Sequence, residues 1–448
     1  MNDKRTTTTN PNNAWYLSSF ERFEKSLNGE AKSSMHAIRR AAIAKFAEVG
    51  FPTTHDEEWK YTDVSPIARM QFKPVLGSAP SGLTTNDIER FTFGIPHLLV
   101  VVDGWFSREL SRLQNLPADV YAGSLAEALR TDGAMIERHL ARHVRYDENA
   151  FTALSAAFLR DGAFIRIPQG RILDAPIHVL CISTVSEDPF VCHPRNLIVA
   201  EKSSQAAVLE SYVSLGQNKY FTNAVSEIVL AENAVLEHDK LQLESNQAFH
   251  VGTIHIHQER NSNFIQHSIS MGGMLTRNNI TAVLDGEGIE STVNGLFLGT
   301  STQHIDNHTA IDHAKPHCNS HELYKGILSG KSRGVFNGKI FVRKDAQKTD
   351  AKQTNKNLVL SDEASIDTKP QLEIFANDVK CTHGATIGQL DEEAIFYLRA
   401  RGVDLAKARD ILIFAFASDV VDRLKIEPLR DHLHAMIHDR LEGERKVA

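Results

Sequence analysis

The 448-residue sequence contains few cysteines, no long apolar run and no excess of positive charge. Four cysteines occur, at positions 181, 192, 318 and 381, and no two form a Cys-x-x-Cys pair. A disulfide framework and a four-thiolate zinc site within one chain are therefore not expected, and a reducing cytoplasm is the natural compartment.

The longest clean apolar stretch is Ile411–Ala417, far shorter than the ~20 residues that cross a bilayer, so we expect no membrane association. The net charge of −7 argues against broad nucleic-acid binding, which requires a basic surface. The N-terminus has no apolar segment typical of a secretory signal. Its polar residues 1–13 predict a disordered segment.

Proline is absent from Arg195 to Lys315, and helical periodicity is missing there too. Apolar residues instead alternate with a period of two, as in Ile265–Met271 and Ile280–Leu284, which is typical of strands. Glycine, asparagine and aspartate separate these alternations every eight to twelve residues, as turns do.

A strand, an acidic turn and a second strand recur loosely at Leu230–Glu237, Leu284–Glu290 and Leu360–Asp367. Such units bury a face only by stacking into a solenoid or closing into a barrel. We therefore expect a mostly-β core over residues 165–388. A β-helix is our first interpretation, and a β-sandwich or cupin-type barrel is the second.

The two flanks are predicted to be helical. Residues 14–164 form a mixed α/β region, with helical spacing in Trp15–Gly50 and Ser124–Arg142 and a buried strand at His97–Val102. Residues 389–448 form a C-terminal helical domain, in which Asp391 and Asp404 are N-caps and Gly402 follows the first helix.

A glycine-rich segment, Gly326–Ser332, is one residue short of a phosphate-binding loop. Arg333–Val342 then reads as turn and strand, whereas a phosphate cradle needs a helix N-terminus. We expect no nucleotide site here, and any ATP chemistry should come from a partner.

Two histidine groups are candidate metal ligands. His255 and His257 lie on the same side of a predicted strand, like the pair of a cupin-type iron or zinc enzyme, but Glu259 is too close to match that pattern. We favour a polar sheet face. A second group resembles a metal-binding composition, although a hydrogen-bonded polar rung or interface face is favoured over a secondary metal site; it comprises His304, His308, His313, His317, Cys318 and His321.

Cys381 and His383 are the most informative pair. On an extended strand they point the same way, about 7 Å apart, and offer a thiolate and an imidazole. Two ligands cannot close a tetrahedral site, so a partner chain or bound ion would complete it. The alternative is a buried structural thiol beside a capping histidine.

Two long segments resemble the SufB/SufD family of iron–sulfur cluster assembly proteins. One spans Asp306 to Asp419 and contains ELYKGILSGKSRGVFNGKIFV and CTHGATIGQLDEEAIFYLRARG, and the other is FPTTHDEEWKYT at 51–62. In SufB the corresponding histidine is flanked by glutamates, and an earlier strand carries a scaffold cysteine. Here Gly384 follows His383, and Gln353–Asn357 contains no cysteine, so the chain resembles the SufD branch.

The resemblance implies a right-handed parallel β-helix between helical N- and C-terminal regions. It further implies a non-catalytic assembly subunit that pairs with a SufB-like paralogue and binds a SufC-like ABC ATPase. A cysteine desulfurase system would deliver sulfur, a reduced flavin could belong to the whole complex, and the chain alone could form a homodimer. Cys381 and His383 match the pair at the paralogue interface, where the histidine is a proposed ligand of a transient iron–sulfur cluster.

The C-terminal helices should retain apolar surface for the ATPase. The predicted docking face comprises Leu412, Phe414, Phe416 and Val420. Two other functions compete with an assembly subunit: a cupin-like metalloenzyme that uses the histidine groups, and a purely structural β-solenoid.

Overall fold

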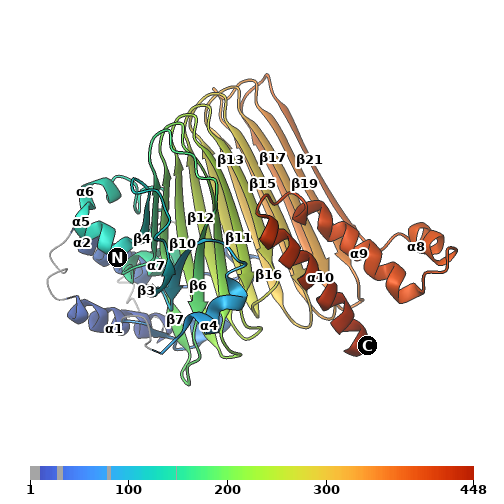
Figure 1. The fold of residues 1–448 in the computed structure, drawn as a ribbon, viewed down its shortest axis with the longest axis horizontal. Coiled ribbons are helices and arrows are strands. Elements are labelled where there is room, and N and C mark those ends of the chain that lie inside the picture. Colours follow the sequence, from blue (N-terminus) through green and yellow to red (C-terminus); the bar gives the residue numbers. More distant parts are fainter. Residues whose placement is uncertain (1–10, 28–33, 78–81, 148, 448) are drawn as a thin grey trace, which may run out of the picture.

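Two long parallel sheets face one another in the computed structural model, which describes residues 11–27, 34–77, 82–147 and 149–447 (Figure 1). Sheet A has the strand order β20-β18-β16-β14-β12-β10-β8-β5-β4, with β7 and β1 beside it. These strands are Tyr121–Ser124 (β4), Ala163–Ile167 (β5), Arg195–Ala200 (β8), Tyr220–Leu230 (β10), Phe249–Gln258 (β12), Leu275–Leu284 (β14), His304–His313 (β16), Arg333–Val342 (β18), Ser365–Ile374 (β20), Phe190–Cys192 (β7) and Lys73–Pro74 (β1).

Sheet B has the order β21-β19-β17-β15-β13-β11-β9-β6-β2-β3. Its strands are His97–Val102 (β2), Trp105–Arg112 (β3), Ile177–Ser183 (β6), Gln205–Ser214 (β9), Val235–Leu243 (β11), Asn263–Ser270 (β13), Glu290–Gly299 (β15), Asn319–Leu328 (β17), Asp350–Val359 (β19) and Lys380–Gly388 (β21). From β8 onward the chain alternates between the sheets, and each strand pairs in parallel with the strand two places later. The result is a β-solenoid of about 8 turns. The predicted β-helix is confirmed, and the sandwich and barrel alternatives are wrong.

Stacked apolar side chains hold the two sheets together. One column on the inner face of sheet A consists of Ile228, Ile256, Ala282, Ile311 and Ile340, one residue per strand and each at most 1% exposed. Burying each isoleucine contributes about 1.5–3 kcal/mol, so the period-two pattern of the sequence becomes the core of the solenoid.

Some residues at the corners between strands adopt the left-handed backbone conformation, with positive φ. Asn233, Asn261 and Gly330 follow β10, β12 and β17 with φ values of 60°, 55° and 64°. Asparagine and glycine tolerate this conformation better than other residues, which explains why they separate the predicted strands.

The N-terminal region closes the first end of the solenoid. Helices α1, α2 and α7 bury aromatic residues against the outer face of sheet A, where Phe46 and Phe151 join the same cluster as Phe221 and Phe249. The helices of this region are Pro11–Ser26 (α1), Ser34–Val49 (α2), Ser65–Arg69 (α3), Thr85–Ile88 (α4), Leu125–Thr131 (α5), Gly133–Ile136 (α6) and Ala150–Ala157 (α7), with short 3-10 helices at Glu57–Trp59 and Glu89–Phe91.

The predicted strand His97–Val102 is β2, which pairs in parallel with β6 and so joins the N-terminal region to sheet B. The predicted helical stretch Ser124–Arg142 contains two short helices that meet at Asp132. Of the segment expected to be disordered, residues 1–10 lie outside the described residues, and Pro11–Asn13 begin α1.

Three C-terminal helices follow the last strand: Glu392–Arg399 (α8), Leu405–Val421 (α9) and Glu427–Val447 (α10). Both predicted N-caps are confirmed, because Asp391 accepts a hydrogen bond from Glu393 N–H at 2.9 Å and Asp404 accepts one from Lys407 N–H at 3.0 Å. Gly402 has the expected positive φ, at 87°. Helices α9 and α10 lie across the outer face of sheet B, whereas α8 projects away from the solenoid (Figure 1).

Candidate metal-ligating site at the open end of the solenoid

The last turn of the solenoid is uncovered. Strands β20 and β21 end their sheets, and each pairs with one strand only among the described residues. Along β21 every side chain is exposed except that of Cys381, and along β20 the side chains are half-buried or exposed. Edge strands present unpaired N–H and C=O groups, so this end can accept another strand.

Cys381 and His383 lie on the inner side of β21, in register with Ala351 and Gln353 of β19. The half-buried Cys381 side chain packs against a small apolar cluster that includes Ala351. Burial raises the pKa of its thiol. His383 is exposed. The two side chains therefore share one face at the rim of the open end, as the spacing predicts.

The predicted histidine-rich group is dispersed by the fold. His304 and His308 lie on the outer face of β16, whereas His313 points inward and its Nε2 lies 2.9 Å from Ser320 Oγ. Cys318 is buried and donates a hydrogen bond to the Gly286 carbonyl at 3.1 Å. His317 lies in the following turn and His321 is exposed on β17. In the part of the chain described, these six residues do not converge as metal ligands, so the secondary metal site loses its geometric basis.

His304 and His308 instead join a polar network on sheet A. His304 Nε2 lies 2.8 Å from Thr62 Oγ1, and His308 Nε2 lies 3.2 Å from Asp306. Asp306 is fully buried and pairs with Arg277 at 2.5 Å, which holds its pKa below the usual range. This network ties the segment containing Thr62 to the solenoid, as expected of a polar rung.

His255 and His257 contact a third imidazole, that of His143. The His143 ring stacks on both, with centroid distances of 5.6 Å and 4.7 Å and interplanar angles of 24° and 21°. Stacked rings present their faces to one another, whereas ligands must direct nitrogen lone pairs to one point. Burial lowers the pKa of His143 and of His255 to about 4. The arrangement supports the polar sheet face over a cupin-like metal site.

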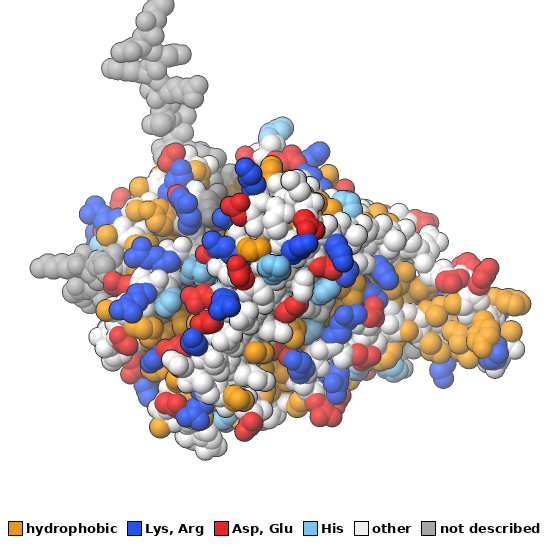
Figure 2. Space-filling model, turned by 90° about the horizontal axis from the view of Figure 1, so that it is seen from above, with side chains coloured by type: hydrophobic (Ala, Val, Ile, Leu, Met, Phe, Trp, Pro, Cys, Tyr) orange, Lys and Arg blue, Asp and Glu red, His pale blue; other side chains and the backbone are white. Residues whose placement is uncertain are grey.

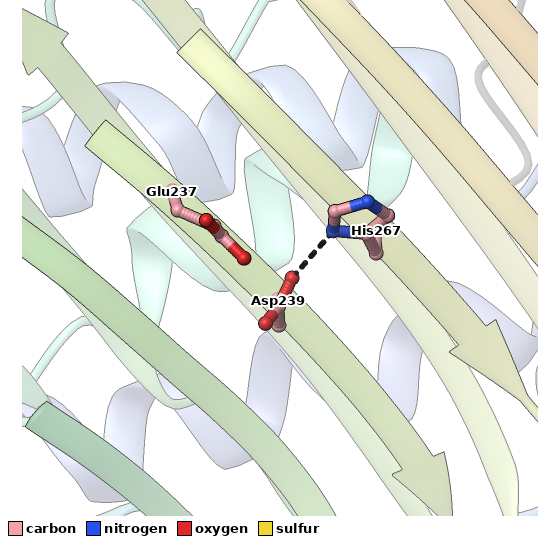
Figure 3. Close-up of side chains that lie close together, drawn as sticks. All are labelled: Glu237, Asp239 and His267. Atoms are coloured by element: carbon pink, nitrogen blue, oxygen red, sulfur yellow. Dashed lines mark hydrogen bonds and ion pairs between the residues drawn. The ribbon is translucent and has the colours of Figure 1, made fainter. Parts of the chain in front are cut away.

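A different group was not predicted from the sequence. Glu237, Asp239 and His267 each offer a ligand atom, and these atoms lie within 4.8 Å of one another (Figure 3). His267 Nδ1 lies 2.8 Å from Asp239 Oδ1, and Glu237 accepts a hydrogen bond from Lys425 N–H at 3.0 Å. Burial, followed by repulsion from Asp239, raises the pKa of Glu237. With these partners the group fixes the corner between α9 and α10 to sheet B.

The predicted docking face on the C-terminal helices requires a correction. Val420 is fully buried, and the other three residues are half-buried against the outer face of sheet B, because α9 packs on β15 and β17. Within the described part of the C-terminal helices, the exposed large apolar side chains lie on α8 and on the first half of α9. Apolar side chains cover the protruding end of the molecule in Figure 2, which is where α8 lies. The exposed large apolar residues of the two helices are Phe396 (74% exposed), Tyr397 (56%), Leu405 (46%) and Ile411 (40%).

Comparison with known proteins identifies the family. Residues 182–416 match the model of the SUF system FeS cluster assembly SufBD core domain, and residues 10–179 match that of the SufBD protein N-terminal region. The chain belongs to the SufBD family. This confirms the resemblance seen in the sequence.

Curated relatives agree with this assignment. An iron–sulfur cluster assembly SufBD family protein of Synechocystis is 33% identical over 424 residues, covering 92% of this chain and 93% of the relative. The iron–sulfur cluster assembly protein SufD of Escherichia coli is 33% identical over 409 residues, covering 90% and 92%. Protein ABCI7, chloroplastic, of Arabidopsis thaliana is 29% identical over 420 residues, covering 92% and 87%. No helix in the described ranges is both long and apolar enough to cross a membrane.

Proposed function

We propose that this SufBD-family chain is the SufD-type subunit of a cytoplasmic assembly complex, and that its open solenoid end pairs with a SufB-like paralogue. The observation that carries the proposal is the uncovered strand β21, which combines an unpaired edge with Cys381 and His383 on one face. A second solenoid that continues the sheets would satisfy the edge and bring its own ligands beside this pair.

The chemistry of the pair suits a transient iron–sulfur cluster. A thiolate is a soft iron ligand, and an imidazole is a more weakly binding one, which favours release of the cluster to a recipient. Because burial raises the pKa of Cys381, the free thiol is protonated at neutral pH and loses its proton when iron binds. The chain then acts as a non-catalytic scaffold subunit.

When the paralogue is absent, the same edge is available to a second copy of this chain. A two-fold homodimer through β20 and β21 is therefore the expected state of the isolated protein. Sulfur from a cysteine desulfurase system and electrons from a reduced flavin would reach the complex through other subunits.

The ATPase docks on α8 and the start of α9 in this proposal. Phe396, Tyr397 and Leu405 are large apolar side chains exposed on a segment that projects from the body of the protein. Such a surface is typical of a protein interface. This exposed surface is supported by half-buried residues of α9 that pack on sheet B, namely Leu412, Phe414 and Phe416.

Co-expression with the SufB-like and SufC-like subunits tests the cluster site. Anaerobic visible spectra should show the sulfide-to-iron charge-transfer absorbance in the wild-type complex and its loss in Cys381→Ser and His383→Ala. His321→Ala, an exposed histidine on β17, is the matched control and should leave the absorbance unchanged. Normal cluster assembly by the His383→Ala complex would refute the assignment.

A second experiment tests ATPase docking. Phe396→Asp should abolish co-purification of the SufC-like ATPase, whereas Val185→Asp should not, although Val185 is also exposed, at 67%. Deleting residues 389–448 should have the same effect as Phe396→Asp. ATPase binding by the Phe396→Asp variant would place the docking face elsewhere.

A further inference from the structure

The interior of the last turns is polar, in contrast to the isoleucine column deeper in the core. On the inner face of sheet B, Glu322 of β17, Gln353 of β19 and His383 of β21 stand in direct register. Glu322 and Gln353 are 3% and 2% exposed. Neighbouring strands lie about 4.8 Å apart, so side chains in register can reach one another. The column leads from a buried carboxylate to the exposed imidazole.

The side-chain amide of Gln353 has a hydrogen-bond partner for its nitrogen but none for its oxygen among the described residues. Its Nε2 donates a hydrogen bond to Glu322 Oε2 at 2.7 Å. Glu322 Oε2 can accept this bond when the carboxyl group is ionised and also when its proton is on Oε1, so the Nε2 end of the amide faces Glu322. The other end, Oε1, is buried and has no partner among the described residues. A buried carbonyl without a donor is unfavourable, so this oxygen points to a missing hydrogen-bond donor.

The opposite sheet leaves room for the amide of Gln353. Gly338 of β18 faces it, and a Cβ atom on Gly338 would lie 2.4 Å from Gln353 Nε2. The absent side chain therefore makes the room that the amide occupies. The next residue of the column, His383, carries a ring N–H and lies one strand away from Gln353 in direct register.

We propose that Gln353 is a positioning residue for His383, accepting a hydrogen bond on Oε1 from one ring nitrogen, directly or through one water. The other ring nitrogen then keeps its lone pair and faces out of the open end. Metal-binding histidines commonly donate their second nitrogen in this way, which fixes both tautomer and ring orientation. An effect of Gln353 on iron binding rests on the proposed function of His383. The effect of Gln353 on the His383 tautomer does not depend on that function.

The tautomer is measured on the full chain, uniformly labelled with ¹³C-histidine, from the Cδ2 chemical shift of His383. The His383→Ala spectrum identifies the signal. We expect a single tautomer in the wild type and a shift toward the averaged value of free histidine in Gln353→Leu. Gln353→Glu retains an acceptor and should keep the single tautomer. It also provides a second variant if Gln353→Leu does not fold.

Gln266→Leu is the matched control. Gln266 is fully buried on the same column, both of its amide atoms lack partners, and Val293 and Glu322 separate it from Gln353. Gln266→Leu also removes a buried amide, but one that does not contact His383. The Cδ2 chemical shift of His383 should therefore not change. An unchanged signal in Gln353→Leu, or an equal shift in Gln266→Leu, would overturn the inference.

Iron titration distinguishes this inference from the proposed function. In the complex with the SufB-like subunit, Gln353→Leu should weaken anaerobic Fe(II) binding by about tenfold. If His383→Ala abolishes binding while Gln353→Leu changes neither the tautomer nor the affinity, the positioning role is wrong and the proposed function stands. If His383→Ala itself binds iron normally, the proposed function is wrong, and the tautomer measurement still decides the contact between Gln353 and His383.

Discussion

Glu322 makes the stability of the solenoid depend on pH. Its carboxyl group is buried inside the last turns, and burial raises its pKa from 4.5 to about 7. Between pH 4.5 and 7 the folded protein holds a proton on Glu322 that the unfolded chain has lost. The free energy of unfolding therefore falls as pH rises through this window and stays lower above it. The shift corresponds to about 3 kcal/mol, at ~1.4 kcal/mol per pH unit.

Replacing Glu322 by glutamine removes this titration but keeps the shape of the side chain. Glu322→Gln should be more stable than the wild type above pH 8, and the difference should shrink by about 3 kcal/mol at pH 4.5. For a cooperative transition of all 448 residues, this amounts to roughly 3 °C in the thermal midpoint. Differential scanning calorimetry across pH 4.5–8.5 measures the difference directly.

The control for this experiment is Glu363→Gln. Glu363 lies on the surface and pairs with Lys331 at 2.8 Å, with side-chain exposures of 65% and 63%. Its replacement should give a melting curve that runs parallel to the wild type across the pH range. If Glu322→Gln also runs parallel to the wild type, Glu322 is not held in a desolvated site, and the account of the polar interior fails.

Three further variants test the packing and the charges described above. Gly295→Ala should destabilise the fold by about 1–3 kcal/mol in denaturant unfolding, because the new Cβ would lie 2.1 Å from the Tyr324 ring. Gly384→Ala should be nearly neutral, because a Cβ there has nothing within 4 Å. Equal losses of stability in the two variants would contradict the close packing at Gly295. Arg277→Met should cost about 3–5 kcal/mol because the buried Asp306 loses its guanidinium partner. Arg343→Met breaks a more exposed pair with Asp312 and should cost at most ~1 kcal/mol. Asp404→Ala should cost about 1 kcal/mol by removing the N-cap of α9, seen as faster hydrogen exchange in its first turn; unchanged exchange would exclude that role.

Local features of the fold were predictable because they depend on neighbours in sequence. The apolar run His97–Val102 forms a strand that is buried throughout, and the caps Asp391 and Asp404 begin their helices where expected. The class of the core also followed from the period-two pattern. The number of turns did not, because corners of different lengths give no fixed repeat in sequence.

Features that depend on register were not predictable. His267 lies beside Asp239 only because β13 pairs with β11 in one particular register. Likewise His304 and His313 lie on opposite faces of β16, which separates a cluster that looks dense in sequence. Val420 was expected on an exposed face. Its burial depends on the outer face of sheet B, which is apolar at Leu296 and joins the same cluster, and the local pattern of the helix does not reveal that face.

The course of the C-terminal chain makes the two ends of the solenoid unequal. After β21 the polypeptide doubles back, so that Lys425 bonds to β11, and Arg440 bonds to the carbonyl of Met271, just after β13. The middle turns are thus clamped from outside. In the described part of the chain β21 pairs with β19 alone, and β20 is tied to the N-terminal region by the ion pair between Lys369 and Glu57. In a stack of repeats, each stabilised by its neighbours, such a terminal turn opens at the lowest free energy. Amide exchange should therefore be fastest along β21 and slow toward β11, so that the final strand can adjust its shape without loosening the turns behind it.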